Sequence, residues 1–192
     1  MPDQGLLFPA LSASRAQGRR LAPGRNQPSH DMVMTPPALA RQIVDYYQPS
    51  GVLLDPCRGD GAFFNAMLRW SDDVRWCEVT EGRDFLTWQE PADWIITNPP
   101  WSKFRPFLRH AMRLAPNIVF LSVMTHFVTK ARLRDITCAG FGIEHPLIVR
   151  TPKAPWPGSG FQLAAWPIRR GARSFFTTLD EVVPDLLEEA AA

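Results

Sequence analysis

Short apolar segments alternate with helix-like segments through the middle of the chain, and this alternation limits the possible folds more than any other feature. The expected strands cover residues 52–55, 74–78, 94–97 and 118–123. The expected helices cover residues 62–70, 104–114 and 126–138, with an irregular connection near residue 84. Such alternation places the strands side by side in parallel, with helices on both faces of the sheet. We therefore predict an α/β fold with a mostly parallel central sheet.

The two ends of this alternating region depart from the pattern. Before it, Thr35 is expected to be the N-cap of a helix that ends near Gln48, since proline is tolerated in a first turn. After it, the apolar segments 143–150 and 161–168 have no helix between them, so they are expected to form an antiparallel C-terminal pair at the edge of the sheet. The predicted domains are a flexible basic arm over 1–30, a folded domain over 31–174 and an acidic helix or tail over 175–192.

Composition limits what else the chain contains. With 192 residues, of which 45% are apolar, the chain is long enough for one buried core. Cys57, Cys77 and Cys138 form neither a C-x-x-C pair nor a cluster with histidine, so neither a disulfide framework nor a zinc site is expected. Because the sequence shows no signal-like or membrane-spanning segment, we expect a cytoplasmic protein without a membrane partner.

Positive charge gathers in one part of the chain, although the net charge is only +2. Residues 101–134 contain seven Lys and Arg residues and no Asp or Glu. Basic side chains recur at four-residue intervals on two expected helices, as Arg105, Arg109 and Arg113 on the first and as Lys130 and Arg134 on the second. A segment of this kind is typical of a surface that faces a polyanion, where its side chains contact phosphates without reading bases.

Asn98-Pro99-Pro100-Trp101 closes the expected strand 94–97 with an amide, two prolines and an aromatic ring. The prolines fix the backbone and remove two donors, so the Asn98 side chain and the adjoining carbonyl are held in place. The result is a pair of hydrogen-bond acceptors beside an aromatic plate, which suits a planar group that carries an amine, such as a nucleobase. For the tetrapeptide alone, a proline-rich loop with a packing tryptophan is the simpler interpretation, and the flanking chain decides between the two.

A glycine-rich loop follows the first expected strand, with the sequence Asp55-Pro56-Cys57-Arg58-Gly59-Asp60-Gly61-Ala62-Phe63. Gly59 and Gly61 let the backbone approach a ligand closely, and the helix after them offers free N–H groups. The loop matches neither the phosphate-binding nor the dinucleotide-binding glycine motif. Its acidic residues Asp55 and Asp60 favour a cationic or hydroxyl-bearing ligand over a polyphosphate.

Two further carboxylates follow in register with this loop. Glu78 ends the second expected strand, where a carboxylate can accept both hydroxyls of a ribose. Asp84 could accept a hydrogen bond from an adenine amino group, with Phe85 as an apolar wall. Either carboxylate alone is more often a solvated turn residue, but together with the glycine loop they indicate a nucleotide-like cofactor.

These motifs resemble those of a known family. The glycine loop, Asp84-Phe85 and the tetrapeptide at 98–101 resemble the class I S-adenosylmethionine-dependent amino-methyltransferases of the N6-adenine DNA type. Thr35-Pro36 resembles the motif that flanks the methionine end of the cofactor, and the motif order is similar to the gamma arrangement. The resemblance covers roughly residues 30–170 and implies a Rossmann-like methyltransferase fold. It also implies S-adenosyl-L-methionine as the cofactor, with no metal.

The resemblance further implies roles for single residues. The catalytic residues would be Asn98, Pro99, Pro100 and Trp101. The cofactor-binding residues would be Thr35, Pro36, Asp55, Pro56, Gly59, Gly61, Phe63, Glu78, Asp84 and Phe85. Other residues are candidates for contact with nucleic acid because they are basic or aromatic: Lys103, Arg105, Arg109, Arg113, Lys130, Arg134, Lys153 and Trp156. The Asn98 side-chain oxygen and the Pro99 carbonyl would accept the two amino hydrogens of an extruded adenine, and Trp101 would stack on its ring.

The functional prediction is methylation of adenine N6 in DNA, with base flipping and relaxed sequence specificity. Relaxed specificity is expected because the chain has no room for the separate target-recognition domain that DNA-specific members usually carry. Three alternatives stay open: adenine methylation in RNA, glutamine methylation on a protein, and a methyltransferase-like nucleic-acid-binding subunit that needs a partner chain. The oligomeric state is also open, and the sequence is compatible with a homodimer or with a partner subunit.

Three side chains that resemble reactive groups are assigned to structural roles. Cys57 lies in the expected cofactor loop and not where a covalent nucleophile would face a base. His110 and His126 are expected to make packing or backbone contacts. No base is required before methyl transfer, because the amine proton becomes acidic only afterwards and can leave to solvent.

Overall fold

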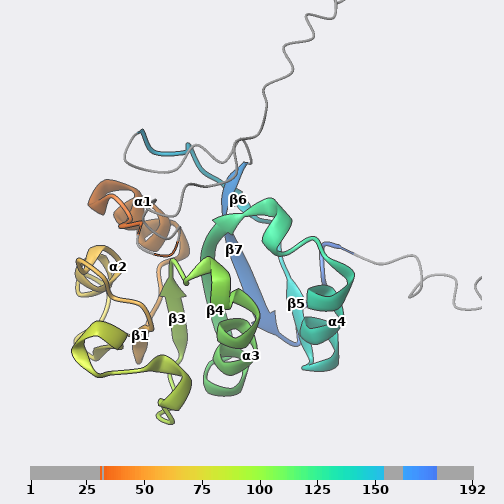
Figure 1. Ribbon diagram of the computed structural model, residues 1–192, viewed down its shortest axis with the longest axis horizontal. Coiled ribbons are helices and arrows are strands. Elements are labelled where there is room, and N and C mark those ends of the chain that lie inside the picture. Colours follow the sequence, from red (N-terminus) through yellow and green to blue (C-terminus); the bar gives the residue numbers. More distant parts are fainter. Residues whose placement is uncertain (1–30, 32, 154–161, 177–192) are drawn as a thin grey trace, which may run out of the picture.

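The computed structural model describes residues 31, 33–153 and 162–176, and a seven-stranded sheet forms its centre. The predicted arm 1–30 and nearly all of the predicted acidic segment 175–192 lie outside these residues. The strands are β1 (Leu53–Asp55), β2 (Val74–Trp76), β3 (Trp94–Thr97), β4 (Asn117–Val123), β5 (Phe141–Ile143), β6 (Leu147–Ile148) and β7 (Leu163–Arg170). Their order is β2-β1-β3-β4-β7-β5, and β6 pairs with β7 off this path. The first four strands in this order are parallel (Figure 1), which confirms the predicted α/β fold.

β7 is the long antiparallel strand of the sheet, and it lies between β4 and β5. It pairs along the whole length of β4. The segment expected as one strand over 143–150 forms two short strands, β5 and β6, which pair with different parts of β7. Pro146 lies between them and has no N–H to donate to the ladder, which explains the interruption. The predicted antiparallel pairing at this edge is confirmed.

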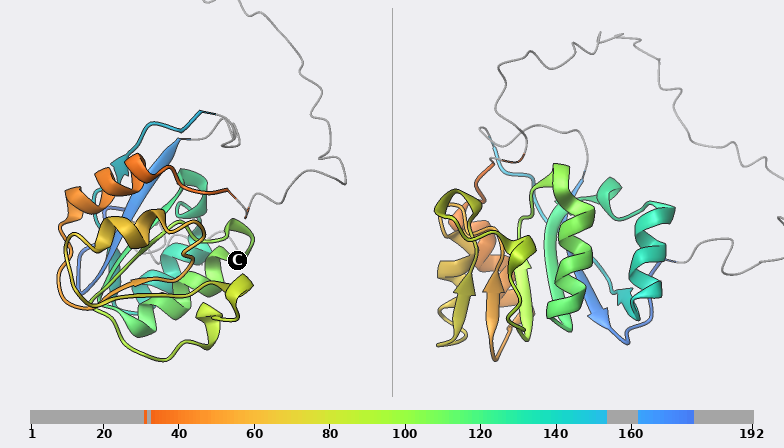
Figure 2. Two further views of the ribbon diagram at one scale, coloured as in Figure 1. Left: turned by 90° about the vertical axis from the view of Figure 1, so that its left-hand side faces the viewer. Right: turned by 60° about the horizontal axis from the view of Figure 1, so that its bottom comes forward.

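Helices cover both faces of the sheet. One face carries α1 (Pro37–Tyr47) and α2 (Ala62–Met67), and the other carries α3 (Phe104–Leu114) and α4 (Lys130–Cys138). The left view of Figure 2 shows these two layers on either side of the sheet. Short 3-10 turns complete the connections: η2 (Val79–Glu81), η3 (Phe85–Thr87), η4 (Trp101–Lys103) and η5 (Met124–His126). In the part of the chain that the structure describes, no helix is long and apolar enough to cross a membrane.

α3 shows how the sequence produces this layering. Its buried residues include Phe104, Phe107, Leu108 and Ala111. This i, i+3, i+4, i+7 pattern is that of a helix with one apolar face. The arginines of α3 lie on the opposite face and are exposed. The same spacing therefore builds the core and puts the positive charges of α3 on the surface.

The boundaries of three helices differ from the prediction. α1 has Pro36 at its N-cap position and no side-chain cap, so the expected N-cap role of Thr35 is wrong, and Thr35 is buried instead. α2 is shorter than expected and ends at Met67. α4 begins at Lys130 and not at 126, because the chain first turns through η5 and buries Phe127 completely.

Candidate functional site

The candidate site lies where the strand order reverses. β1 has β2 on one side and β3 on the other, and all three strands run in parallel. At such a point the loops diverge and leave a crevice outside the carboxyl ends of the strands. The loop after β1 holds the glycine motif, and the loop after β3 holds the tetrapeptide at 98–101. The structure thus brings together the two motifs that the sequence analysis had connected.

Asp55 joins these two loops from inside the sheet. The residue is fully buried, and its carboxylate accepts a hydrogen bond from Thr97 Oγ1 on β3 at 2.8 Å. The backbone N–H groups of Cys57 and Phe64 also donate to the carboxylate, at 3.3 and 3.1 Å. Burial raises the pKa of Asp55 to about 6, even though these hydrogen bonds favour the charged form. Because all three donors are protein groups, Asp55 positions the glycine loop.

Glu78 ties the glycine loop to the end of β2. Its Oε2 accepts a hydrogen bond from the Gly59 N–H at 2.9 Å. Its Oε1 accepts from the backbone N–H and the hydroxyl of Thr80, at 3.1 and 2.8 Å. A carboxylate has about four lone-pair sites, so about one remains for a ligand. The structure therefore leaves Glu78 about one acceptor site, whereas the sequence suggested that it accepts two hydroxyls of a ribose.

Gly59 shows why the loop needs glycine. Its φ is +50°, in the left-handed region that side chains rarely adopt. A Cβ atom added here would lie 2.7 Å from the sulfur of Met34. The loop therefore packs closely against the segment that precedes α1, which contains Thr35 and Pro36.

Two aromatic residues that were expected at the cofactor lie in the core instead. Phe63, on α2, is 3% exposed and belongs to the hydrophobic cluster on the α1 and α2 side of the sheet. Phe85 is 1% exposed, and its ring centroid lies 5.0 Å from that of Phe107 and 4.8 Å from that of His110. The expectation that Phe85 forms a wall of the cofactor site is therefore corrected. Its neighbour Asp84 is exposed, and one of its oxygens caps η3.

Asn98 carries the most informative polar group of the site. Its Nδ2 donates to the carbonyl oxygen of Val33 at 3.3 Å, which fixes the orientation of the amide. Its Oδ1 is buried and has no hydrogen-bond partner among the described residues. Leaving a buried acceptor without a donor costs about 1–3 kcal/mol. The amide oxygen is thus a fixed acceptor that no donor of the described residues reaches.

Trp101 begins η4 directly after the two prolines and is partly buried. Its ring lies edge-on to that of His126, with the centroids 5.1 Å apart. His126 comes from η5, after β4, and its Nδ1 lies 2.7 Å from Ser122 Oγ. Burial, together with the charge of Arg132, lowers the pKa of His126 to about 4. A neutral imidazole therefore packs beside the aromatic plate, a proximity that the sequence did not reveal.

The segment before α1 is fastened across the tetrapeptide loop. Asp31 accepts hydrogen bonds from the backbone N–H of Ser102 at 2.9 Å and from its hydroxyl. The Val33 carbonyl accepts the hydrogen bond from Asn98. The segment touches the glycine loop as well, so all three sequence motifs meet at one place.

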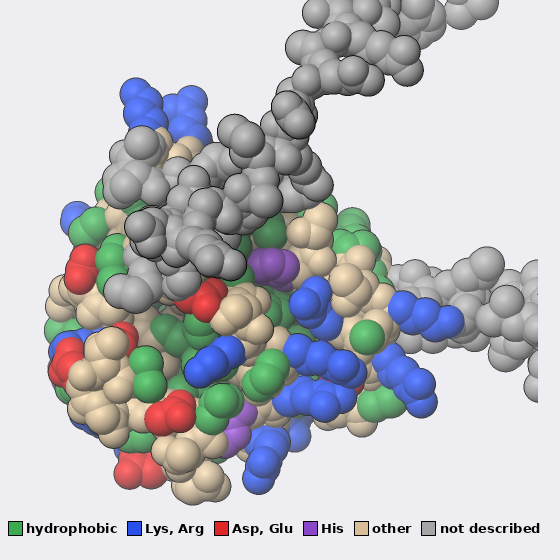
Figure 3. All heavy atoms as spheres, viewed as in Figure 1, with side chains coloured by type: hydrophobic (Ala, Val, Ile, Leu, Met, Phe, Trp, Pro, Cys, Tyr) green, Lys and Arg blue, Asp and Glu red, His purple; other side chains and the backbone are tan. Residues whose placement is uncertain are grey.

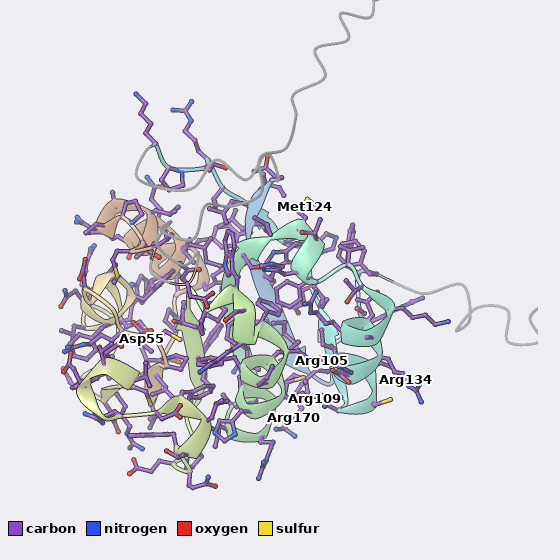
Figure 4. All side chains as sticks on the ribbon, in the orientation of Figure 1. Asp55, Arg105, Arg109, Met124, Arg134 and Arg170 are labelled. Atoms are coloured by element: carbon purple, nitrogen blue, oxygen red, sulfur yellow. The ribbon has the colours of Figure 1, made fainter. Side chains whose placement is uncertain are left out.

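Arg105 and Arg109 are both engaged by one carboxylate. Nε and Nη2 of Arg105 donate to Asp135 of α4 at 2.6 and 3.0 Å, and the same atoms of Arg109 donate at 3.0 and 2.6 Å. Figure 4 shows the two arginines in front of α3, with α4 beside them. Both arginines lower the pKa of Asp135. Asp135 directly follows the basic segment 101–134 and therefore neutralises part of its charge. Arg105 and Arg109 are thus less available to phosphates than their four-residue spacing suggested.

The other basic candidates lie on the surface. Lys103, Arg113, Lys130, Arg134 and Lys153 are all exposed. Figure 3 shows Lys and Arg side chains gathered over the α3 and α4 side of this face. Figure 4 places Arg134 toward the outer side of α4, away from Arg105 and Arg109. Trp156 and most of its predicted loop lie outside the described residues.

Arg132 was not among the sequence candidates, yet it lies close enough to both His126 and Arg105 for their ionisation to be coupled to its charge. Its guanidinium carbon is 5.4 Å from the centre of the Phe104 ring. Its Nε is buried and has no hydrogen-bond partner in the described part of the chain. Burial and the charge of Arg105 lower the pKa of Arg132. The four-residue spacing on α4 selects Lys130 and Arg134 and leaves Arg132 out. The burial of Arg132 could not be predicted from that spacing, because it depends on how α4 packs.

Cys57 and His110 have the structural surroundings that were expected. Burial raises the pKa of the Cys57 thiol. His110 is buried, and its Nε2 lies 2.9 Å from the carbonyl oxygen of Trp88. Within the described ranges, no group of three or more His, Cys, Asp or Glu side chains could hold a metal ion.

Comparison with known proteins identifies the fold. No protein-family model and no curated protein matches the chain. A proposed class I S-adenosylmethionine-dependent methyltransferase from Listeria monocytogenes superposes with a TM-score of 0.59 at 14% identity, covering 85% of this chain and 72% of that one. A proposed RNA methyltransferase from Pyrococcus horikoshii gives 0.57 at 17% identity, with coverages of 78% and 92%. The 23S rRNA methyltransferase ErmE gives 0.56 at 14% identity, with coverages of 81% and 77%. At these identities the likeness shows the fold alone, which is the Rossmann-like fold of class I methyltransferases.

Proposed function

We propose that the protein transfers a methyl group from S-adenosyl-L-methionine to an amino group of a nucleobase, with adenine N6 in DNA as the substrate. The buried and unpartnered Oδ1 of Asn98 carries this proposal. Its orientation is set by the Val33 carbonyl, and it stands on the loop that continues into Trp101. An acceptor that is held rigidly next to an aromatic ring fits the amino group of a stacked base.

The loops after β1 and β2 fit the cofactor. Gly59 has no side chain, so the glycine loop and Met34 can lie close together. Glu78 retains about one acceptor site for a hydroxyl of the cofactor. Asp84 is exposed, and only one of its two carboxylate oxygens accepts the hydrogen bond that caps η3. When bound, the cofactor supplies an electrophilic methyl group. The fold of the chain supports this assignment, since it is shared with a class I S-adenosylmethionine-dependent methyltransferase.

The chain's own residues act on the amine. The exocyclic nitrogen of adenine is a poor nucleophile, because its lone pair is delocalised into the ring. Asn98 Oδ1 and the Pro99 carbonyl accept the two amino hydrogens and stabilise the positive charge that develops on nitrogen. Trp101 stacks on the base and fixes its plane, which aligns the nitrogen for attack. The neutral ring of His126 packs against Trp101 without adding a competing charge.

Single-stranded or unpaired bases are the favoured targets. Extruding a base from a duplex costs a few kcal/mol, whereas stacking on an aromatic side chain returns about 1–3 kcal/mol. RNA is the alternative polymer, and two of the three similar structures described above are named as RNA methyltransferases. DNA remains the first choice because the motifs resemble those of the N6-adenine DNA enzymes.

A methylation assay with isotope-labelled cofactor tests the proposal. The protein is incubated in parallel with unmethylated single-stranded DNA and with RNA of the same sequence, and the nucleosides are analysed by mass spectrometry. We expect label in N6-methyladenine from the DNA reaction. Label confined to the RNA reaction would move the substrate to RNA. If calorimetry shows that the cofactor binds but neither polymer is labelled, the proposal is wrong.

Asn98→Ala tests the acceptor directly. The substitution removes a preorganised group that acts on developing charge, and we expect kcat to fall by about 10²–10³. The affinity for the cofactor should change much less than kcat, because the side chain of Asn98 bonds to Val33 and makes no hydrogen bond to the glycine loop within the described residues. Gln42→Ala, which removes an exposed amide on α1, is the matched control and should keep full activity. An active Asn98→Ala variant would contradict the proposed role.

A further inference from the structure

Arg132 combines partial burial with the lack of an anionic partner among the described residues. Its Nε is buried without a hydrogen bond, whereas Arg105 and Arg109 are held by Asp135. A buried charged donor that is left unpaired is costlier than a neutral one. The charge of Arg105 adds repulsion. An anion from outside the chain would relieve both effects.

The position of Arg132 relates it to Trp101. Its guanidinium carbon lies 5.4 Å from the centre of the Phe104 ring. The Phe104 ring lies 5.2 Å from that of His126, which in turn lies 5.1 Å from that of Trp101. The charge of Arg132 also contributes to the lowered pKa of His126. A short row of aromatic rings therefore separates this cation from the aromatic plate of the tetrapeptide.

We propose that Arg132 binds a phosphate of the nucleic-acid strand next to the base that Trp101 holds. The proposal rests on the proposed function in taking Trp101 as the platform for the base. Within a nucleic acid, each phosphate is joined to its base through one sugar, so a cation near the platform meets the backbone of the same strand. Guanidinium is suited to this group because its fork of donors matches the oxygens of a phosphate.

The arrangement divides the arginines of this face into two kinds. Asp135 orients Arg105 and Arg109 and cancels one of their two charges, so this trio adds a single positive charge. Arg132 keeps its whole charge and has no competing carboxylate among its described contacts. We therefore expect Arg132 to contribute more to backbone binding than either paired arginine.

Two substitutions at Arg132 separate its charge from its packing on Phe104. Arg132→Met keeps an apolar stem and removes the charge, and Arg132→Lys keeps the charge. Binding of a fluorescein-labelled single-stranded DNA oligonucleotide is measured by anisotropy over a series of salt concentrations, with the RNA of the same sequence as a second arm. Arg41→Met, on the α1 side of the sheet, is the matched control. Calorimetry with the cofactor shows whether each variant retains the cofactor site.

Arg132→Met is expected to weaken binding by about tenfold or more, as for the loss of a charged hydrogen bond. It should also reduce the slope of log K against log salt by about 0.7, the value for one phosphate of a single strand. Arg132→Lys should keep most of the slope, and Arg41→Met should behave as wild type. Wild-type affinity and slope in Arg132→Met would overturn the proposal, and so would equal losses in both Arg132 variants with an unchanged slope. Charge-dependent binding at Arg132 without any methyl transfer would uphold the phosphate site and reject the proposed function.

Discussion

Burial shifts the ionisation of two side chains at the candidate site in opposite directions. Burial raises the pKa of Asp55 to about 6 and lowers that of His126 to about 4, because each loses the water that stabilises its charged form. Asp55 is nevertheless charged near neutral pH, since three protein donors surround it. His126 is neutral there. The glycine loop thus encloses a negative charge, while the imidazole that packs against Trp101 is neutral.

The titration of His126 is a prediction at this scale. Between about pH 5 and 8 an unperturbed imidazole changes its charge, but the ring protons of His126 should keep the chemical shifts of the neutral form. In Arg132→Met its pKa should rise part of the way toward the ordinary value, because burial remains and the repulsion is gone. NMR of ring-labelled histidine measures both. An apparent pKa near 6.5 in the wild type would contradict the buried position of His126.

Among the secondary-structure elements, β1 and β3 are joined at the site by a side-chain hydrogen bond in addition to their backbone pairing. Thr97 Oγ1, at the end of β3, donates to Asp55 at the end of β1, and both residues are fully buried. The bond holds the glycine loop and the tetrapeptide loop at a fixed separation. It also stabilises the charged form of a carboxylate that burial disfavours. The effect of losing this bond therefore depends on pH.

Thr97→Val replaces this donor with a methyl group of similar size. Asp55 has a raised pKa, so its contribution to stability is greatest below its ordinary value of 3.8 and falls as the pH rises through about 6. Without Thr97 the charged form loses a donor, and we expect a cost of about 1.5–3 kcal/mol at about pH 8 and a smaller cost at about pH 5. Urea unfolding at both values measures it. Thr137→Val, at an exposed position of α4, is the matched control, and equal effects of both variants would refute the prediction.

The elements differ in how well the sequence predicts them. The strand at 94–97 and the helix at 104–114 have the predicted bounds, because an apolar run ending at two prolines and a regular amphipathic repeat are both local signals. The start of α4 was misplaced, since the depth at which Phe127 is buried depends on distant parts of the chain. The pairing of Arg105 with Asp135 escaped prediction for the same reason: it joins residues 30 positions apart on different helices.

On the scale of the whole molecule, the candidate site depends on the last strand of the sheet. β7 lies between β4 and β5, so residues late in the sequence complete the sheet. Trp166 on this strand is fully buried, and its ring stacks on Phe127 with the centroids 4.8 Å apart. Its Nε1 donates to the carbonyl oxygen of Ser122 at 3.2 Å, and the Ser122 hydroxyl contacts His126. Trp166 on β7 is thus connected, through Phe127 and Ser122, with the surroundings of Trp101. The sequence could not show this connection, because Trp166 and Trp101 lie far apart along the chain.

Trp166→Ala is expected to lower the free energy of unfolding by about 3–5 kcal/mol, the usual cost of emptying a buried aromatic site. Trp166→Phe keeps a ring and should cost less, although the Ser122 carbonyl still loses its donor. Because Trp166 supports η5 through Phe127 and Ser122, the milder variant should also weaken nucleic-acid binding while the affinity for the cofactor is kept. Urea unfolding, anisotropy of labelled nucleic acid and calorimetry with the cofactor measure the three quantities.

Phe175→Ala, at a site that is 54% exposed, is the matched control and should shift stability by no more than about 0.5 kcal/mol. If Trp166→Phe reduced cofactor and nucleic-acid affinity equally, the C-terminal edge would support the whole sheet and not the surroundings of Trp101 in particular.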